Sequence, residues 1–461
     1  MTGVEYRKSL LDGRKVYLKG NLVEDLAEDP VLGDVVTRVA ADYDRLHRED
    51  ESANVLMAVP RSADDLRRQI PMIHEMGMMA HVTYTSVMTM ATAASRLGEV
   101  APESVERIHA CIEDARFRDI RITQCITDAK GDRGLPPGKQ HDPDAYTRVV
   151  DRTPDGVVIR GAKLHITGAS VGHELMVVPT KAMRPGEEDY AIACLVPVAA
   201  EGVKIIDTTY APDPDEAEDF PVSSRSYYPE GFVILDDVFV PNERVLLDGL
   251  TGQAATFAHA LGLWERVGGL ATMVDRAEAL TGLAQLIAEA NGLTRINHVK
   301  DKITDMMIQT TLIRGSLEAA ITHCHSGTDG VVFPDELYIN AGKYHGAATY
   351  SDLVRNLHDI AGGSTATVPS LADLRNPDTG ELLRKYMGTS KDVDGEYRMR
   401  LFHAIRDLTA GTYGGWKAVT VLQAGGGLYA QRSVTRRHFD LEHARHRALE
   451  LINLDTPEGT G

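Results

Sequence analysis

Cysteine is scarce in this sequence: its 461 residues include four, Cys111, Cys125, Cys194 and Cys324, which are scattered and form no CxxC pair. This pattern is typical of free thiols in a reducing compartment and argues against a disulfide framework. The N-terminus lacks the apolar run of a signal peptide, and no apolar stretch approaches the length of a membrane span. We therefore expect a cytoplasmic protein with no membrane partner.

Positive charge is also in short supply, since the formal net charge is -18 at pH 7. Nucleic acids and anionic membranes need a basic surface, so neither is expected as a partner. A local cluster of Arg and Lys can still bind an anionic small molecule. The apolar content of 43% and the charged content of 25% are ordinary for a soluble globular protein.

Several motifs lack what their chemistry requires. The segment AGGGLYAQR (424–432) has no Lys-Ser/Thr pair and no preceding strand, which excludes a P-loop. His323 and His325 are two residues apart, and on a helix their imidazoles point well apart and do not share one metal ion. No nicotinamide-binding Rossmann fingerprint is present either. We expect no metal site.

The hydrophobic pattern changes twice along a chain that is longer than one core usually supports. Residues 1–139 are mainly helical, with an N-cap pattern at Ser62. Residues 140–250 carry short strand-like runs without intervening helices, which indicates an antiparallel barrel or sandwich. Residues 251–461 carry long amphipathic helices typical of an up-and-down bundle. The predicted fold class is α+β, with an N-terminal helical domain, a central antiparallel β domain and a C-terminal helical bundle.

The stretch from Thr127 to Gly168 joins a loop rich in Gly, Pro and charge, TDAKGDRGLPP, to a β-branched strand, DGVVIRGAKLHITGAS. Lys163, His165 and Thr167 are spaced at period two, so one face of a regular strand presents an ammonium, an imidazole and a hydroxyl. Such a face suits a polar planar ligand with an anionic tail. An exposed edge strand is the alternative interpretation.

A series of motifs runs in order along nearly the whole chain: EYRKSLLDGRKVY, SADDLR, TDAKGDRGL, DPDAYTRVV, DGVVIRGAKLHITGA, PTKAM, DDVFVPNERV, NHVKDKI, DIAGG and AGGGLYAQR. The series resembles flavoproteins with the acyl-CoA-dehydrogenase-type fold. The branch it resembles holds 4-hydroxyphenylacetate 3-monooxygenase (large component) and 4-hydroxybutyryl-CoA dehydratase/vinylacetyl-CoA isomerase.

This resemblance implies FAD bound to a homotetramer. Successive backbone N–H groups of a Gly-rich loop can hold a pyrophosphate, and Arg133 can add a charge-assisted hydrogen bond. Without the surrounding motifs, Asp132 and Arg133 would be interpreted as an ion pair within the loop. The positions that match flavin-contacting residues are Gln124, Cys125, Ile126, Lys130, Gly131, Asp132, Arg133, Thr167, Gln423, Ala424, Gly425 and Gly426.

The iron–sulfur ligands of the dehydratase are missing. Thr83 and Val87 stand at its first two cysteine positions, Glu265 stands at the histidine, and Thr272 stands at the last cysteine. Thiolates hold clusters of this kind, so we expect no iron–sulfur cluster and no dehydration by that mechanism. Gly269 also replaces the dehydratase's catalytic tyrosine.

The substrate-binding residues of the monooxygenase are replaced as well. Its arginine, tyrosine and histidine match His81, Thr85 and Gln124. A substrate carboxylate would lose its arginine clamp, whereas His81 could replace some of the lost contacts, with Tyr84 nearby as a hydrogen-bond donor. The resemblance therefore implies a retained flavin cradle and a rewritten substrate pocket.

Three further residues have both a functional and a structural interpretation. His165 shares the predicted strand face with Thr167, which favours a functional group over a surface histidine. His81 lies on an apolar helix, where a histidine is either a core residue or catalytic. Cys125 adjoins the flavin loop, and a small buried apolar role is favoured over chemistry there.

Glu265 also has two interpretations. It is either a general base whose pKa is raised by apolar neighbours, or the ion-pair partner of Arg266 or Arg276, which is slightly favoured. The two differ in the direction of the pKa shift and in the side chain that the carboxylate contacts.

The expected function is that of the oxygenase component of a two-component FADH2-dependent monooxygenase that oxidises an aromatic or other electron-rich small molecule. A separate flavin reductase supplies the reduced FAD, which reacts with O2 to a C4a-hydroperoxide in a site that excludes water. The alternatives are a cluster-free flavin-dependent dehydratase or isomerase of an acyl-CoA or related substrate, and a flavin-binding protein without catalysis. The residues expected to take part in catalysis are His81, Tyr84, Thr85, His165 and Glu265.

Overall fold

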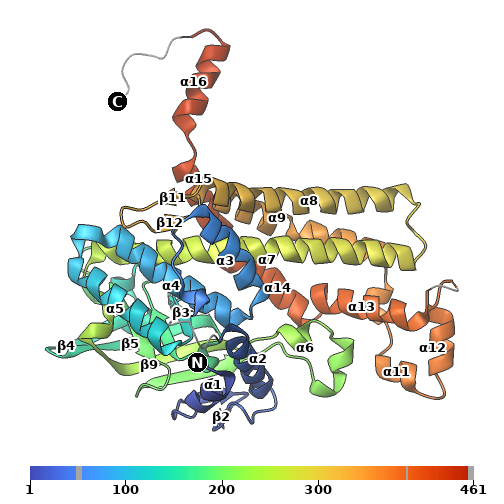
Figure 1. Ribbon diagram of the computed structural model, residues 1–461, viewed down its shortest axis with the longest axis horizontal. Helices are drawn as coiled ribbons and strands as arrows, with labels where there is room; N and C mark the ends of the chain where they lie inside the picture. The colour runs from blue at the N-terminus through green and yellow to red at the C-terminus, as the bar shows by residue number, and fades with distance from the viewer. Residues whose placement is uncertain (48–53, 391–392, 455–461) are drawn as a thin grey trace.

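The computed structural model describes residues 1–47, 54–390 and 393–454 (Figure 1). Ser62 caps α3, as predicted, because its hydroxyl accepts a hydrogen bond from the Asp65 N–H at 3.1 Å. The helix α4 is buried along most of its length, and its buried side chains continue the core formed by α7. The helices of this first region are α1 (Gly3–Ser9), α2 (Leu32–Leu46), α3 (Ala63–Glu75), α4 (Met78–Leu97) and α5 (Pro102–Arg118).

Two sheets form the centre of the molecule. A six-stranded sheet has the order β2-β1-β8-β9-β5-β4, and a four-stranded sheet has the order β10-β7-β6-β3. Ile159 of one sheet and Val177 of the other belong to the same hydrophobic core, so the two sheets pack face to face as a sandwich. The strands are β1 (Val16–Leu18), β2 (Asn21–Val23), β3 (Ile122–Cys125), β4 (Arg148–Thr153), β5 (Gly156–Thr167), β6 (Glu174–Val177), β7 (Ile192–Pro197), β8 (Val203–Thr208), β9 (Glu230–Pro241) and β10 (Val245–Asp248).

Segments from before residue 140 complete both sheets. The hairpin β1–β2 turns through Lys19 and Gly20, whose φ angles are 51° and 86°, and β1 then pairs in parallel with β8. The strand β3 pairs in parallel with β6 at the edge of the smaller sheet. The remaining pairs in these two sheets are antiparallel, as predicted. The boundaries after residues 139 and 250 stay predictions.

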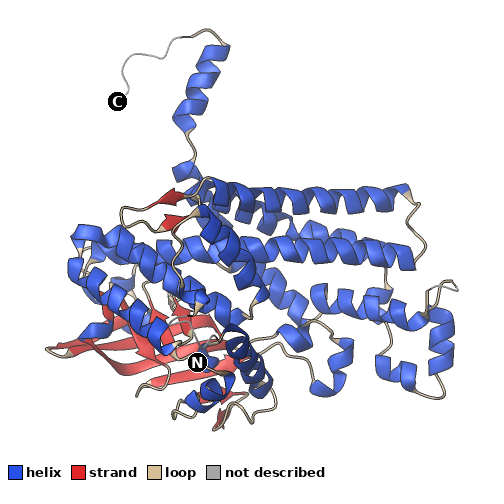
Figure 2. Cartoon of the chain, in the orientation of Figure 1, coloured by secondary structure: helices blue, strands red, loops and turns tan. Residues whose placement is uncertain are grey.

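The C-terminal region is helical, and the predicted order of helices, strands and helices is confirmed. Figure 2 shows the strands of the two larger sheets gathered at one end of the molecule, with long helices running beside and above them. No helix in the described ranges is long and apolar enough to span a bilayer. The short helix α6 (Ser223–Ser226) precedes β9, and the helices that follow β10 are α7 (Ala254–Ala290), α8 (Asn297–Thr322), α9 (Glu336–Ala361), α10 (Ser364–Thr367), α11 (Leu371–Arg375), α12 (Gly380–Met387), α13 (Gly395–Thr409), α14 (Thr412–Gln423), α15 (Leu428–His438) and α16 (Leu441–Leu451). A short hairpin of β11 (His325–Ser326) and β12 (Val332–Phe333) lies between α8 and α9 in the chain.

The strand face predicted from Lys163, His165 and Thr167 does not form, because β5 carries a bulge. His165 has a φ of 61°, and the register with β9 shifts between Lys163 and Ile166. The extra residue puts the buried side chains of Lys163 and Ile166 on one face and Thr167 on the other, while His165 is exposed. The period-two argument was wrong here because a bulge reverses the alternation of side chains that follows it.

Lys163 has a structural partner instead. Its Nζ lies 2.7 Å from Asp128 Oδ1, and the two side chains are 1% and 2% exposed. The same ammonium donates to the carbonyl oxygens of Ile126 at 3.2 Å and Val178 at 2.9 Å. Asp128 in turn accepts a hydrogen bond from the Thr147 N–H at 2.9 Å. This buried ion pair therefore fixes the loop after β3 against both sheets.

Removing one partner tests how much this ion pair contributes to the free energy of unfolding. We expect Lys163→Met to lower the free energy of unfolding by about 3–5 kcal/mol, since it leaves the Asp128 carboxylate buried without a cation. Lys204→Met is the matched control, because Lys204 pairs with Asp236 at the surface, where the side chains are 46% and 58% exposed, and an exposed pair contributes about 0–1 kcal/mol. Urea unfolding measures both values, and equal losses would contradict the structural role of Lys163.

Candidate functional site

Four polar side chains from three elements meet between α4, β3 and α7. His81 and Thr85 are one turn apart on α4, so they face the same way. The Thr85 hydroxyl lies 3.3 Å from Glu265 Oε1 of α7, and His81 Nε2 lies 3.6 Å from the same oxygen. Gln124 of β3 donates from Nε2 to the Thr85 hydroxyl. The structure thus brings together His81, Thr85, Gln124 and Glu265, all of which were singled out from the sequence.

The charge of Glu265 is stabilised by this network. Burial by itself would raise the pKa of Glu265, but the His81 imidazole at 3.6 Å, followed by hydrogen bonds from Gln124 and Thr85, lowers the pKa below its usual value. The carboxylate is therefore ionised at neutral pH. It can hold a positive charge on the His81 imidazole, which makes the two side chains an acid–base pair.

The raised pKa and the ion-pair partners expected for Glu265 were wrong, whereas its role in catalysis stays a prediction. The pKa is lowered rather than raised, and the partner of the carboxylate is His81. Arg266 donates from Nε to the Gly425 carbonyl at 2.8 Å, and Arg276 donates from Nη2 to the Tyr413 hydroxyl at 2.8 Å. The reason is helical geometry, since neighbouring residues on α7 point in different directions.

The apolar end of the site is built from two aromatic rings. The Tyr84 and Trp264 rings meet edge to face with centroids 5.8 Å apart. Tyr84 donates its hydroxyl proton to Gln69 Oε1 at 2.9 Å, and the Trp264 indole N–H donates to Thr92 Oγ1 at 2.7 Å. Because both donors bond to groups away from the pocket, the rings present apolar edges to it.

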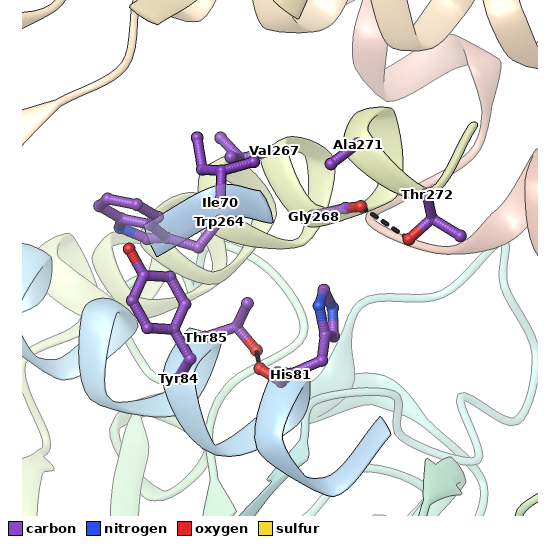
Figure 3. A pocket seen from close by; sticks show the side chains of 9 residues that line it. All are labelled: Ile70, His81, Tyr84, Thr85, Trp264, Val267, Gly268, Ala271 and Thr272. Atoms are coloured by element: carbon purple, nitrogen blue, oxygen red, sulfur yellow. Dashed lines mark hydrogen bonds between the residues drawn. The ribbon is translucent and has the colours of Figure 1, made fainter. Parts of the chain in front are cut away.

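Figure 3 shows these rings and the His81 imidazole around one small pocket. The enclosed cavity is about 10 Å³, room for about one water molecule. The residues that line it are Ile70, His81, Tyr84, Thr85, Trp264, Val267, Gly268, Ala271 and Thr272. The lining is therefore apolar except at the end that carries His81, Thr85 and Thr272.

The sequence reasoning missed Gly268, which determines where His81 lies. A Cβ atom on Gly268 would meet the His81 Cε1 atom at 2.0 Å, so the imidazole packs directly on the backbone of α7. Gly269 lies beside it and leaves room for the buried side chain of Lys343, whose Cε would be 3.1 Å from a Cβ there. Paired glycines inside a long helix lower its stability, so their presence was the signal of a close approach.

The loop predicted to hold an anion lies at the end of β3 and gathers positive charge. Lys130 and Gly131 have φ angles of 72° and 47°, which turn the chain sharply. Burial and then the nearby charge of Arg133 lower the pKa of Lys130. Asp132 accepts a hydrogen bond from the Gly134 N–H at 2.8 Å, and no ion pair joins it to Arg133 in the described residues. The loop thus has cations that repel one another, an arrangement that an anionic ligand stabilises.

Thr167, which was predicted to contact the same cofactor, bonds to a buried carboxylate. Its hydroxyl lies 2.8 Å from Glu230 Oε2. Burial raises the pKa of Glu230 to about 7, although the bond from Thr167 opposes this shift. The thiol of Cys125 is fully buried, and burial raises its pKa to about 12, which fits the structural role favoured from the sequence. His165 is exposed at the bulge, and it does not line the pocket.

The triple-glycine loop after α14 is held by two buried cations. Lys343 Nζ donates to the Val421 carbonyl at 2.7 Å, at the C-terminal end of α14, where carbonyl groups lack helical partners. Arg266 bonds to Gly425, and Gln431 Nε2 donates to the Gly426 carbonyl at 2.8 Å. A Cβ on Gly425 would meet the Glu265 Cβ at 3.4 Å. The predicted segment from Gln423 to Gly426 therefore lies beside Glu265 rather than far from the pocket.

Comparison with known proteins gives consistent matches along the chain. Residues 2–247 match the family model described as "4-hydroxyphenylacetate 3-hydroxylase N terminal", and residues 254–453 match "4-hydroxyphenylacetate 3-hydroxylase C terminal". The oxygenase component of 4-hydroxyphenylacetate 3-monooxygenase from Thermus thermophilus is 28% identical, over 90% of this chain and 89% of that protein. These matches confirm the resemblance inferred from the motifs.

Two solved structures share the fold. An oxygen-tolerant archaeal 4-hydroxybutyryl-CoA dehydratase from N. maritimus has a TM-score of 0.90 and 27% identity, and covers 100% of this chain and 96% of its own. The oxygenase component of 4-hydroxyphenylacetate 3-monooxygenase, complexed with FAD, has a TM-score of 0.88 and 24% identity, with 98% of each chain covered. Proteins named for two different reactions therefore share this architecture.

The close contact at Gly268 can be tested with a matched pair of glycines on α7. Within the described part of the chain, a Cβ atom on Gly282 would meet no other atom within 4 Å, so Gly282→Ala should raise the free energy of unfolding by about 0.5–1 kcal/mol through helix propensity. Gly268→Ala should lose this gain, displace the imidazole of His81 and let the pKa of Glu265 rise. Urea unfolding and the ¹⁵N chemical shifts of the His81 ring measure these effects. Equal gains in stability with unchanged His81 shifts would contradict the contact.

Proposed function

The chain belongs to the 4-hydroxyphenylacetate 3-hydroxylase family, and from this premise we propose that it is the oxygenase component of a two-component FADH2-dependent monooxygenase. Its substrate is an aromatic or other electron-rich small molecule. The observation that carries the proposal is the pocket walled by Tyr84 and Trp264, which ends in the pair His81–Glu265 and adjoins Gln124 of β3. The lining suits an aromatic ring with one polar group, and the cavity of about 10 Å³ has to widen to admit it.

The cofactor proposed for this site is FAD. Its diphosphate suits the cationic loop of Lys130 and Arg133, whose backbone turns through two positive φ angles. Thr167 and the segment from Gln423 to Gly426 supply further polar contacts on either side of the site. When bound in its reduced form, FAD supplies the electrons with which O2 is activated for insertion into the substrate.

The side chains of the pocket have distinct proposed roles. His81 Nε2 takes the proton of a substrate hydroxyl, and Glu265 stabilises the resulting imidazolium at 3.6 Å. Gln124 and Thr85 hold the carboxylate of Glu265 in place through their hydrogen bonds. The apolar edges of Tyr84 and Trp264 flank the ring and keep water from the reacting atoms.

An iron–sulfur cluster is not part of the proposal. The four positions that match the cluster ligands of the dehydratase carry Thr83, Val87, Glu265 and Thr272, and none of them is a thiolate donor. A cluster-free dehydratase or isomerase is the second candidate. It is favoured by the pair His81–Glu265, which could shuttle a proton without any net oxidation.

The proposal requires O2 and a separate flavin reductase, since the sequence has no nicotinamide-binding fingerprint. We place the protein in the cytoplasm, because its four cysteines are free thiols in the described part of the chain. Neither nucleic acid nor a membrane is a proposed partner, given the net charge of -18.

A turnover experiment tests this function. The protein is supplied with FAD, an unrelated flavin reductase, NADH, ¹⁸O2 and a simple phenol, and mass spectrometry follows the product. We expect one ¹⁸O atom in a hydroxylated product, and no product when the reductase is omitted. His81→Gln should lower kcat/KM by about 10²–10⁴-fold through loss of the base, whereas His109→Gln, on the exposed face of α5, should not.

Product formation without O2 or reductant would overturn the proposal and select the dehydratase or isomerase. Bound FAD with no reaction towards O2 would instead favour a flavin-binding protein without catalysis. In both cases the binding of FAD is measured separately by the quenching of its fluorescence.

The proposed assembly is a homotetramer, supported by apolar side chains at the end of the chain. The helix α16 has no buried residue and projects from the body of the molecule (Figure 1). The exposed fractions of Leu441, Leu451 and Ile452 are 63%, 81% and 62%. An apolar surface of this kind on a projecting helix is typical of an interface, here with another copy of the chain.

Charge placed on this surface tests the assembly. The double variant Leu441→Asp/Leu451→Asp should sediment as a smaller species than the wild type, because burial of the added carboxylates against another subunit is unfavourable. His446→Asp, a charge added to an exposed position of the same helix, is the control and should keep the wild-type mass. Equal masses for all three proteins would contradict a role of α16 in the tetramer.

A further inference from the structure

The pocket has no cation to balance a negatively charged substrate. Its described lining includes His81 and no Lys or Arg. Glu265 is not part of the lining, but its carboxylate lies 3.6 Å from His81 Nε2 and 3.3 Å from the Thr85 hydroxyl, both of which belong to lining residues. The side chains of His81 and Glu265 are 15% and 17% exposed, so neither is fully sealed in the core.

The nearest cations are engaged elsewhere. Lys343 is 1% exposed and donates to the Val421 carbonyl at 2.7 Å, near the C-terminal end of α14. Arg266 donates to the Gly425 carbonyl at 2.8 Å. Turning either side chain into the pocket would leave the carbonyl of Val421 or of Gly425 without its partner. Glu265, 3.3 Å from the Thr85 hydroxyl of the lining, is therefore a negative charge to which no Lys or Arg is bonded in the described residues.

A negatively charged substituent on a para-substituted phenol is unfavourable in either orientation of the ring. With the hydroxyl toward His81, the substituent lies among Ile70, Val267 and Ala271, where a charge would lose its hydration without gaining a partner. With the orientation reversed, a substrate carboxylate would lie against the ionised Glu265. The cavity is about 10 Å³, room for about one water molecule, so the lining has to open to admit the ring and leaves little space for water that could screen these charges.

We propose that this pocket takes an uncharged phenol, whose hydroxyl faces the His81–Glu265 pair, and that Glu265 excludes phenols that carry a carboxylate. This proposal rests on the monooxygenase function proposed above, and it specifies the charge of the substrate. Glu265 thus acts as the specificity-determining residue. The relatives named for 4-hydroxyphenylacetate act on a carboxylate-bearing phenol, so this chain would differ from them in substrate charge.

Three probes of similar shape separate charge from size. These are 4-ethylphenol, which is neutral, tyramine, which is a cation, and 4-hydroxyphenylacetate, which is an anion. Isothermal titration calorimetry with the FAD-loaded protein gives their Kd values without any turnover. We expect 4-ethylphenol to bind at least about tenfold more tightly than 4-hydroxyphenylacetate, because the carboxylate is desolvated without a partner. Tyramine should bind more weakly than 4-ethylphenol and more tightly than the anion.

Variants assign the effect to Glu265. Glu265→Gln keeps the size of the side chain and removes its charge. It should therefore lower the ratio of the Kd of 4-hydroxyphenylacetate to the Kd of 4-ethylphenol by at least about threefold. Glu99→Gln, the same change at an exposed position, should leave this ratio of Kd values unchanged.

The proposal is overturned if 4-hydroxyphenylacetate binds as tightly as 4-ethylphenol, or if none of the three probes binds. It is also overturned if Glu265→Gln leaves the ratio of the Kd values of 4-hydroxyphenylacetate and 4-ethylphenol unchanged. Failure of the monooxygenase function would give a different outcome. The charge preference in binding would persist, but no phenol would gain an oxygen atom from O2.

Discussion

The buried ion pair of Lys163 and Asp128 is the constraint on which the rest of the site depends. Its atoms are 2.7 Å apart, and its side chains are 1% and 2% exposed. Because a buried charge without its partner is strongly unfavourable, the loop after β3 has one stable position relative to both sheets. This position fixes the loop with Lys130 and Arg133 on one side, and Gln124 of β3 on the other. Gln124 then reaches Thr85 and, through it, Glu265. One ion pair in the sandwich therefore couples the proposed cofactor loop to the pocket on α4 and α7.

The two halves of the site carry opposite charge, although the chain as a whole is acidic. The loop gathers cations whose mutual repulsion lowers the pKa of Lys130 after burial has done so, and this suits a diphosphate. The pocket instead carries an ionised carboxylate at the edge of an apolar cavity, which suits an uncharged ring. Lys343 donates to the Val421 carbonyl near the end of α14, and Arg266 donates to the Gly425 carbonyl after it. The opposite charges of the loop and the pocket therefore suit the proposed assignment of the flavin diphosphate to the loop and of the substrate to the pocket.

The sequence predicted the order of the three regions because hydrophobic periodicity and caps such as Ser62 are local features. Through the resemblance of motifs it also singled out His81, Thr85, Gln124 and Glu265, which the structure brings together and whose roles stay predictions. It failed at His165 because the bulge in β5 is set by pairing with β9, which no local pattern reveals. It failed on the partner of Glu265 because that partner comes from another helix, far away in the chain. The contact of Gly268 with His81 had a local signal, the paired glycines in a long helix, which was not used.

The most direct test of this account is a crystal structure of the protein with FAD and 4-ethylphenol. The account predicts the flavin diphosphate on the loop of Lys130 to Arg133, the isoalloxazine ring between Gln124 and Thr167, and the phenol hydroxyl beside His81 and Glu265. A flavin bound elsewhere would contradict it, as would a metal–sulfide cluster between α4 and α7 or a phenol bound away from Glu265.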